Sequence, residues 1–457
     1  MKKTNRSSLW LSALALLLVA GCGGDGPGGP TPSTPTPVTP TTADKVVVYE
    51  AYPGMFGESG GLQGITSRLD EIQEVGANVL WLMPIYEQGT LTEGDHKAVG
   101  SPYCVKDYYK VNASYGTLGD LKALVNAAHG KGIRVILDWV GNHTSWDSAW
   151  ITEHPDWYTH DANGGIISPP GFNWYDVADL NYSNIEMRRA MLDAMKWWVT
   201  EADVDGFRCD YADGVPADFW TAAITELRAT GKGSELLMLA ESSSAEMFAA
   251  GFDMNYAWSF ASTLQGLYSG TKKAGDLYST HAAEYSGVAE GKHRLRMTTN
   301  HDMNNENATP TLYKSLDGAF SAYVIVATMG GCPMIYGSQE IGYDKTVPFF
   351  RNYQMDWSLN PAYREKYEKL MSVRAGSAAL LAGESTTYNV DDRVVCYKRV
   401  NGAEEVFVVV NTSGTATTIG LPLDVALSEV TDMMDGSRFT TATTLALGGY
   451  DYKIWEN

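Results

Sequence analysis

Residues 204–210 read Val204-Asp205-Gly206-Phe207-Arg208-Cys209-Asp210, a short and largely apolar run that ends in a carboxylate. The run predicts a β-strand, and the amphipathic stretch Ala217–Ala229 that follows predicts a helix. The same pair, a short apolar run and then a helical pattern, recurs from about Lys45 to about Leu381. The quoted stretch is therefore one unit of a repeat, and the repeat decides the fold class.

Eight runs of this kind are strand candidates. They lie at Val46–Tyr52, Asn78–Pro84, Ile133–Val140, Val204–Asp210, Leu236–Glu241, Phe252–Tyr256, Arg294–Asn300 and Met334–Gly337. Amphipathic stretches such as Leu118–His129 and Ile185–Ala202 lie between them. Eightfold strand–helix alternation predicts an α/β fold, a closed parallel (β/α)8 TIM barrel wrapped in helices, over residues 45–382.

Two segments depart from the repeat. Residues 142–183, after the third strand, are rich in Trp, Pro, Gly and Asp and are long for a plain connection, so they predict an insertion subdomain. After about Ala382 the pattern changes to period-two alternation, as in Arg393–Val400 and Glu405–Val410. That period predicts a C-terminal antiparallel β-sandwich domain over residues 383–457.

The N-terminus predicts export and anchoring. Over residues 1–22, basic residues precede the apolar stretch Leu9–Ala20, which ends in Val19-Ala20-Gly21-Cys22. This arrangement resembles the lipobox of a lipoprotein signal peptide, in which the cysteine is lipidated; an ordinary signal peptide with an incidental cysteine is the alternative. Residues 23–44 are almost all Gly, Pro, Thr and Ser and predict an extended linker. We expect an exported protein, lipid-anchored through Cys22 to a bacterial membrane at the cell surface or periplasmic side, with the outer membrane among the candidates.

Charge and cysteine content narrow the partners. The formal net charge of −20 argues against nucleic acid or anionic lipid as a binding partner and is compatible with a neutral substrate such as a sugar. The other cysteines, Cys104, Cys209, Cys332 and Cys396, lack metal-like spacing. A disulfide framework is not expected, a single bridge stays open, and the sequence does not indicate an oligomer.

Four predicted strands end in a carboxylate: Asp138, Asp210, Glu241 and Asp302. Any one of them could be a helix N-cap or a surface charge. Four at equivalent positions should converge, because active sites of this barrel lie at the C-terminal ends of its strands. Glycosidic cleavage needs one carboxylate to attack the anomeric carbon and a protonated second one to release the leaving oxygen. An arginine holds the first ionised by charge pairing, and crowding keeps the second protonated.

The motifs around these carboxylates resemble those of the α-amylase family, glycoside hydrolase family 13. They read Asp138-Trp139-Val140-Gly141-Asn142-His143, Gly206-Phe207-Arg208-Cys209-Asp210, Leu239-Ala240-Glu241 and Asn300-His301-Asp302. The resemblance implies a retaining mechanism with Asp210 as nucleophile, Glu241 as acid/base and Asp302 as transition-state stabiliser. It also implies that Arg208 orients Asp210 and that His143, His301 and Asp138 bind sugar.

Two places depart from the family pattern. Tyr103, in Ser101-Pro102-Tyr103, falls where the family usually has an aromatic platform, although the family more often shows His-Gly-Tyr; core packing of Tyr103 is an equal alternative. Asp213 and Gly214 stand where many members have Lys-His on the leaving-group side. Leaving-group binding must therefore be built differently.

The resemblance also implies a structural Ca2+ held by oxygen atoms of Asn142, Asp179 and the Gly214 carbonyl. A metal-free hydrogen-bonded turn is the alternative.

The leading hypothesis is an α-amylase that hydrolyses internal α-1,4-glucosidic bonds of starch-like glucans, with α-glucan polysaccharide or maltooligosaccharides as substrates. An α-glucosidase or glucanotransferase acting on maltooligosaccharides is the alternative within the family. A non-catalytic surface glycan-binding protein is the alternative outside enzymes.

Overall fold

The computed structural model describes residues 37–57, 61–91 and 100–457. The predicted signal peptide with Cys22, and the linker up to residue 36, lie outside the described residues. In the part of the chain that is described, no helix combines the length and the apolar character needed to cross a bilayer.

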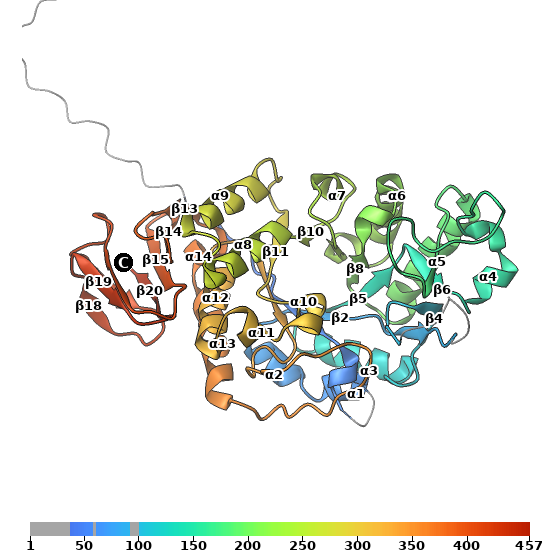
Figure 1. Ribbon diagram of the computed structural model, residues 1–457, viewed down its shortest axis with the longest axis horizontal. Coiled ribbons are helices and arrows are strands. Elements are labelled where there is room, and N and C mark those ends of the chain that lie inside the picture. The colour runs from blue at the N-terminus through green and yellow to red at the C-terminus, as the bar shows by residue number, and fades with distance from the viewer. Residues whose placement is uncertain (1–36, 58–60, 92–99) are drawn as a thin grey trace, which may run out of the picture. The chain divides into compact units, whose positions relative to one another are not determined.

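A closed barrel of eight parallel strands forms the main domain, in the order β1-β12-β11-β10-β9-β8-β5-β2 (Figure 1). The strands are β1 Val48–Ala51, β2 Val79–Leu82, β5 Arg134–Val140, β8 Gly206–Asp210, β9 Leu237–Ala240, β10 Met254–Tyr256, β11 His293–Arg296 and β12 Cys332–Tyr336. Each overlaps one of the eight predicted runs. The predicted fold class is confirmed.

The strands carry two cores, one inside the barrel and one between the barrel and its helices. Inside lie alternate residues such as Val48, Trp81 and Leu239, while Tyr49, Leu80 and Met238 pack outward. Both faces are buried because helices cover the outside, so the strands appear in the sequence as continuous apolar runs.

Helices and short 3-10 turns connect the barrel strands, and two further helices, α13 and α14, follow the last strand. They are η1 Pro53–Met55, α1 Gly61–Thr66, α2 Leu69–Glu74, α3 Leu118–His129, α5 Ile185–Glu201, η3 Ala212–Gly214, α6 Ala217–Arg228, η4 Gly233–Glu235, α7 Ala245–Ala249, α8 Trp258–Ser269, α9 Ala274–Tyr285, α10 His301–Glu306, α11 Thr309–Leu312, α12 Leu316–Thr328, α13 Pro361–Gly376 and α14 Ala378–Ala382. Helix α3 begins at a capping box in which Thr117 and Asp120 bond each other's backbone N–H groups. Its apolar residues at helical spacing, such as Leu121, Leu124 and Val125, are buried.

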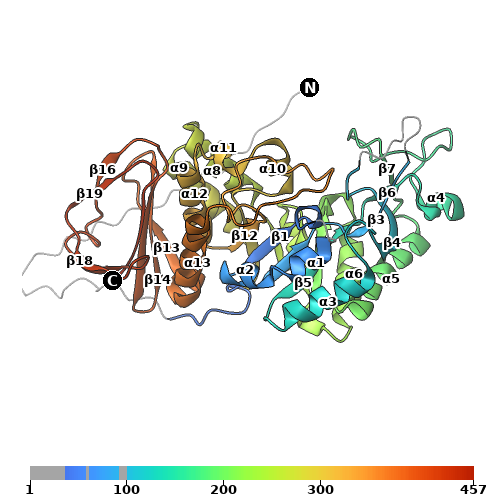
Figure 2. The ribbon, with the colours of Figure 1, turned by 90° about the horizontal axis from the view of Figure 1, so that it is seen from below.

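Two inserted segments, here called excursions, extend from the barrel, one after β2 and one after β5. One is the hairpin β3 Tyr86–Gln88 with β4 Val105–Val111; the other holds β6 His143–Ser145, α4 Ala149–Glu153, η2 Pro155–Trp157 and β7 Val177–Asp179. Figure 2 shows β3, β4, β6, β7 and α4 together at one end of the barrel, where β4 contacts β6. The second excursion lies within the predicted insertion, whereas the first was not predicted because its strands are short and mostly polar.

The C-terminal part is antiparallel, as predicted. A six-stranded sheet has the order β13-β14-β15-β20-β17-β18, and β16 pairs with β19 in a second sheet. The bounds are β13 Glu384–Thr387, β14 Val394–Asn401, β15 Glu404–Asn411, β16 Thr417–Gly420, β17 Glu429–Asp432, β18 Arg438–Thr440, β19 Thr444–Leu447 and β20 Tyr452–Glu456. One face of β14 and β15 packs toward the barrel helices, and the other face packs with residues of β16 and β19.

The folded chain begins before residue 45. The Val38 backbone bonds the Asn401 side chain in both directions, at 2.6 and 2.7 Å, and Asp44 lies 3.2 Å from the His293 ring. These contacts attach the end of the predicted linker, residues 37–44, to both domains.

Candidate active site

Strand register brings the predicted site residues to one end of the barrel. Asp138 on β5 pairs with Arg208 on β8, and Val140 with Asp210. On the other side of β8, Cys209 pairs with the last residue of β9, so that Glu241 follows next to Asp210. Parallel strands in register therefore place carboxylates from three strands on the same level.

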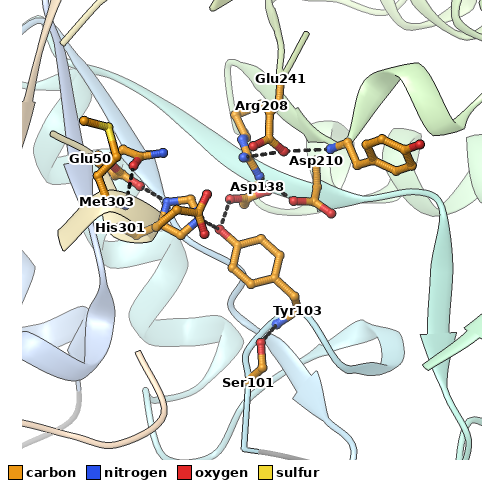
Figure 3. A network of polar contacts seen from close by, with 12 residues as sticks. Glu50, Ser101, Tyr103, Asp138, Arg208, Asp210, Glu241, His301 and Met303 are labelled. Atoms are coloured by element: carbon orange, nitrogen blue, oxygen red, sulfur yellow. Dashed lines mark hydrogen bonds and ion pairs between the residues drawn. The ribbon is translucent and has the colours of Figure 1, made fainter. Parts of the chain in front are cut away.

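Arg208 joins these carboxylates (Figure 3). Its Nη1 donates to Asp138 Oδ1 at 2.8 Å and to Asp210 Oδ1 at 2.9 Å. Its Nη2 lies 2.8 Å from Glu241 Oε2, an ion-pair contact without hydrogen-bond alignment. The guanidinium is fully buried and lies 4.9 Å from the centre of the Trp81 ring, which adds a cation–π contact.

One cation among three carboxylates, of which Asp138 is buried and Asp210 and Glu241 are partly exposed, leaves negative charge in excess. Burial raises the pKa of Asp210 and of Glu241, and for Glu241 the neighbouring Asp210 and Asp302 add to the increase. Burial also raises the pKa of Asp138 to about 7, although the ion pair with Arg208 opposes it. The three carboxyls therefore hold a shared proton more readily than isolated carboxyls do.

Hydrogen bonds indicate which carboxyl keeps it. Asp138 accepts from Arg208, from Trp81 Nε1 at 3.1 Å and from the Tyr103 hydroxyl at 3.1 Å. Three donors stabilise the ionised form of Asp138, so we assign it as a carboxylate despite its burial. Glu241 accepts the Tyr211 backbone N–H at 2.8 Å and lines the cavity, where a protonated oxygen can reach a ligand. The shared proton fits best on Glu241.

Asp302 reaches the site from a helix, which corrects the predicted strand Arg294–Asn300. The strand β11 ends at Arg296, and Asn300 is the N-cap of α10, its side chain accepting from Met303 N at 2.9 Å. Asparagine at an N-cap begins a helix, so Asp302 lies in the first turn of α10 rather than at a strand end. It remains half exposed and lines the cavity, 3.4 Å from His301 Nε2.

Tyr103 is part of both the polar network and the cavity wall. Its hydroxyl lies 2.8 Å from His301 Nε2, and its ring stacks on His301 with centroids 5.3 Å apart. His143 approaches the Tyr103 carbonyl through Nε2 at 3.2 Å. Burial lowers the pKa of His143 to about 4, so its ring is neutral near pH 7.

These side chains line a cavity of about 620 Å3 with several aromatic rings that the sequence did not single out. The rings belong to Phe172, Trp174, Tyr211, Trp258, Phe349 and Phe350. Phe172 and Trp174 stack at 4.2 Å and 13°, and Tyr211 meets both edge-on at 5.1 and 5.5 Å. In the sequence, only the high aromatic content of residues 142–183 pointed to such rings, and it did not show which rings face the cavity.

Asp213, at one of the positions that depart from the family pattern, also lines the cavity and accepts the Ser242 hydroxyl at 2.7 Å. This part of the cavity therefore combines a hydrogen-bonded carboxylate with the aromatic ring of Tyr211.

The predicted calcium ligands are neighbours. A Cβ placed on Gly214 would lie 2.6 Å from Asn142 Oδ1, and Asp179 on β7 pairs with His143, the residue after Asn142. Burial raises the pKa of Asp179, which is partly exposed. A carboxylate on the strand paired with the residue after Asn142, together with the Asn142 amide oxygen, provides oxygen ligands of the kind that a hard cation prefers. Within the described ranges, no cluster of three or more His, Cys, Asp or Glu side chains suits a metal.

The cysteines play no part in the site. Cys104, Cys209, Cys332 and Cys396 are all buried and free, so none of them forms the single bridge that the sequence left open.

Two known domain families match the chain. "Alpha amylase, catalytic domain" matches residues 35–165 and 171–373, and "Maltogenic Amylase, C-terminal domain" matches residues 386–454.

Individual known proteins are also similar to the chain. An α-amylase of Haloarcula japonica is 29% identical over 416 residues, which cover 86% of this chain and 59% of the relative, so the chain spans about three fifths of that protein. A cyclomaltodextrinase of Geobacillus thermopakistaniensis is 26% identical, with 85% and 68% covered. Among solved structures, a maltogenic α-amylase of Thermotoga neapolitana has a TM-score of 0.81 at 25% identity, and an α-amylase of Lactobacillus plantarum 0.81 at 27%. Each alignment covers 91% of this chain and 99% of the other.

Proposed function

Because the chain belongs to the α-amylase family of glycoside hydrolases, we propose that it hydrolyses internal α-1,4-glucosidic bonds of starch-like glucans with retention of configuration. The observation that carries the proposal is the Arg208 contact with Asp138, Asp210 and Glu241 at the floor of one cavity. Starch-like polysaccharide and maltooligosaccharides are the proposed substrates, and the acidic chain makes nucleic acid an unsuitable partner.

In the first step Asp210 attacks the anomeric carbon while Glu241 gives its proton to the glycosidic oxygen. The bond to the leaving sugar breaks, and a β-glucosyl ester forms on Asp210. Arg208 keeps Asp210 ionised for the attack, and its own burial makes that charge pairing strong. Asp302 acts as the transition-state stabiliser: it binds ring hydroxyls more tightly as positive charge develops on the sugar.

In the second step the Glu241 carboxylate takes a proton from water, and the water oxygen attacks the anomeric carbon. Asp210 leaves as a carboxylate, and Glu241 is protonated again for the next cycle. His143, His301 and Tyr103 line the cavity and hold the sugar at the point of cleavage, while the buried Asp138 supports them through its hydrogen bond with Tyr103.

The product pattern tests the endo-acting proposal. Amylose, pullulan and maltotriose are incubated with the enzyme and sampled over time. A rapid viscosity fall of amylose with mixed maltooligosaccharides is expected. Glucose as the sole product, or disproportionation of maltotriose, would favour the α-glucosidase or glucanotransferase alternative. The similarity to a cyclomaltodextrinase is compatible with that alternative.

Glu241→Gln tests catalysis itself. General acid–base groups contribute about 10²–10⁴-fold, so this variant should lose activity by that factor while it still binds maltooligosaccharides. The control is Glu246→Gln, which changes an exposed glutamate in the first turn of α7. Equal, measurable activity of wild type and Glu241→Gln would show that Glu241 is not the acid/base. Glycan binding without hydrolysis by the wild type would support the non-catalytic alternative.

Calcium and the membrane anchor are further parts of the proposal. Asn142, Asp179 and the Gly214 carbonyl would hold Ca2+, which would neutralise Asp179 and brace the insertion against the barrel. Lipid on Cys22 would anchor the exported protein to a bacterial membrane. Cys22→Ser should then move the protein from the membrane fraction to the soluble fraction, and unchanged membrane association would exclude lipidation at this residue.

A further inference from the structure

Glu50 is a buried carboxylate that the proposed mechanism does not use. It lies on β1, where it pairs with Tyr336 on β12 and Trp81 on β2, and it is fully buried. Its Oε1 is 2.5 Å from His301 Nδ1, whereas its Oε2 has no hydrogen-bond partner among the described residues. An uncompensated carboxylate in such a place is costly, so the His301 ring is the group that balances its charge.

Hydrogen bonding at the other ring nitrogen shows which atoms carry protons. The Tyr103 hydroxyl donates its single hydrogen to Asp138 Oδ2 (Figure 3). In that arrangement the Tyr103 oxygen accepts from His301 Nε2 at 2.8 Å, so Nε2 carries a hydrogen. The contact between Nδ1 and Glu50 Oε1 then places a second hydrogen on Nδ1. A ring that donates from both nitrogens is an imidazolium.

Other charged groups face the same ring from several elements. They are Asp302 on α10, Tyr103 in the loop before β4, Arg208 on β8, and the carboxylates Asp138 and Asp210. Burial by itself lowers the pKa of His301, but Asp302 and Glu50 outweigh burial and Arg208 and raise it to about 9. Of Glu50 and Asp302, only Glu50 is fully buried, whereas Asp302 is half exposed.

We propose that Glu50 is a positioning residue for the reaction: it fixes His301 as an imidazolium whose Nε2–H points to Tyr103 and the cavity. His301 then donates to Glu50 from Nδ1 and to the Tyr103 hydroxyl from Nε2, and Asp138 accepts from both Tyr103 and Arg208. With a neutral His301 that carries hydrogen only on Nδ1, the Tyr103 hydroxyl would turn to Nε2 and leave Asp138. The inference rests on the proposed function only for the role of His301 toward sugar.

The test is the titration of His301 in Glu50→Gln. The chain has eight histidines, so selective labelling of the ring carbons gives a small NMR spectrum, and His301→Gln identifies the signal. Removing an opposite charge in direct contact should lower the His301 midpoint by about 1–3 pH units. Glu50→Asp keeps the charge at a longer distance and should restore part of the shift; it also serves if Glu50→Gln does not fold.

The matched control is Glu340→Gln. Glu340 is also a buried glutamate near the end of β12, but its partner is the Tyr49 hydroxyl at 2.7 Å rather than a histidine. It should leave the His301 midpoint unchanged whatever it does to stability.

The pH dependence of activity is a second test of the proposal. In Glu50→Gln, kcat/KM should fall most at alkaline pH and should recover at acidic pH, where His301 is protonated again. A midpoint equal to wild type, or a loss of activity that is uniform across pH, would overturn the proposal. The titration needs no substrate, so a chain without glucan hydrolysis but with the shifted midpoint would refute the proposed function and leave this inference standing.

Discussion

Replacing Arg208 with methionine should produce a defect that grows with pH. The substitution keeps much of the side-chain volume but removes the only cation in contact with Asp138, Asp210 and Glu241 in the described structure. Removing one partner of a buried ion pair costs about 3–5 kcal/mol, and here three contacts of 2.8–2.9 Å are lost together. We expect a loss of stability of at least that size at neutral pH.

The sign of the pH dependence follows from the carboxyls that remain. Without Arg208, burial raises their folded-state pKa values further above the unfolded ones, so their protonated forms favour the folded state. Stability should then be highest at low pH and should fall as pH rises through the folded-state pKa values. The Arg208→Met defect should accordingly be small near pH 4 and large near pH 8.

The assay is urea unfolding of wild type and variant at several pH values. Arg294→Met is the matched control, because Arg294 is another largely buried barrel arginine whose hydrogen bonds go to Asn255 and to backbone carbonyls of Ser243 and Glu284. The loss of stability caused by Arg294→Met should vary little with pH. A parallel pH dependence for both variants, or an Arg208→Met defect below 1 kcal/mol, would refute the assignment of Arg208 as the charge partner of the carboxylates.

Three shorter predictions concern other parts of the molecule. Trp174→Ala removes the ring that stacks on Phe172, so KM for maltooligosaccharides should rise by about 2- to 13-fold, as expected from about 0.5–1.5 kcal/mol of aromatic contact; unchanged KM would exclude the ring from substrate binding. Burial beside Arg296 lowers the pKa of His281 to about 3. As pH falls below about 6.5, the unfolded chain therefore binds a proton at His281 before the folded chain does, and the folded state loses stability. In His281→Gln the free energy of unfolding should decrease less between pH 6.5 and 3, as measured by unfolding curves. Chelation with EDTA should lower the Tm and added Ca2+ should restore it, whereas Asp179→Asn should abolish that response; a chelation effect that persists in the variant would place the ion elsewhere.

Local pattern was sufficient for the fold class and the central site residues. Each strand of the barrel is a run of three to seven residues, and its apolar composition follows from burial on both faces. Asp138, Asp210 and Glu241 could be placed because the C-terminal ends of barrel strands meet at one rim. The end of the seventh strand was misplaced because Thr298 and Thr299 suit a strand, whereas Asn300 caps a helix.

Other features depended on closure of the barrel. Nothing local marks Glu50 as a site residue, since it sits inside an apolar strand and meets His301 from 251 positions away. The aromatic wall likewise joins Phe172 and Trp174 of the insertion to Tyr211 after β8, and only the path of the insertion decides which rings face the cavity.

The sequence by itself determined the elements and the residues at their ends, because hydrophobic period and strand-end chemistry are properties of neighbouring residues. Only the tertiary structure decided how charge is shared among Arg208, three carboxylates and the Glu50–His301 pair. That sharing depends on contacts near 3 Å between strands, and such distances are set by barrel register and packing rather than by any local pattern.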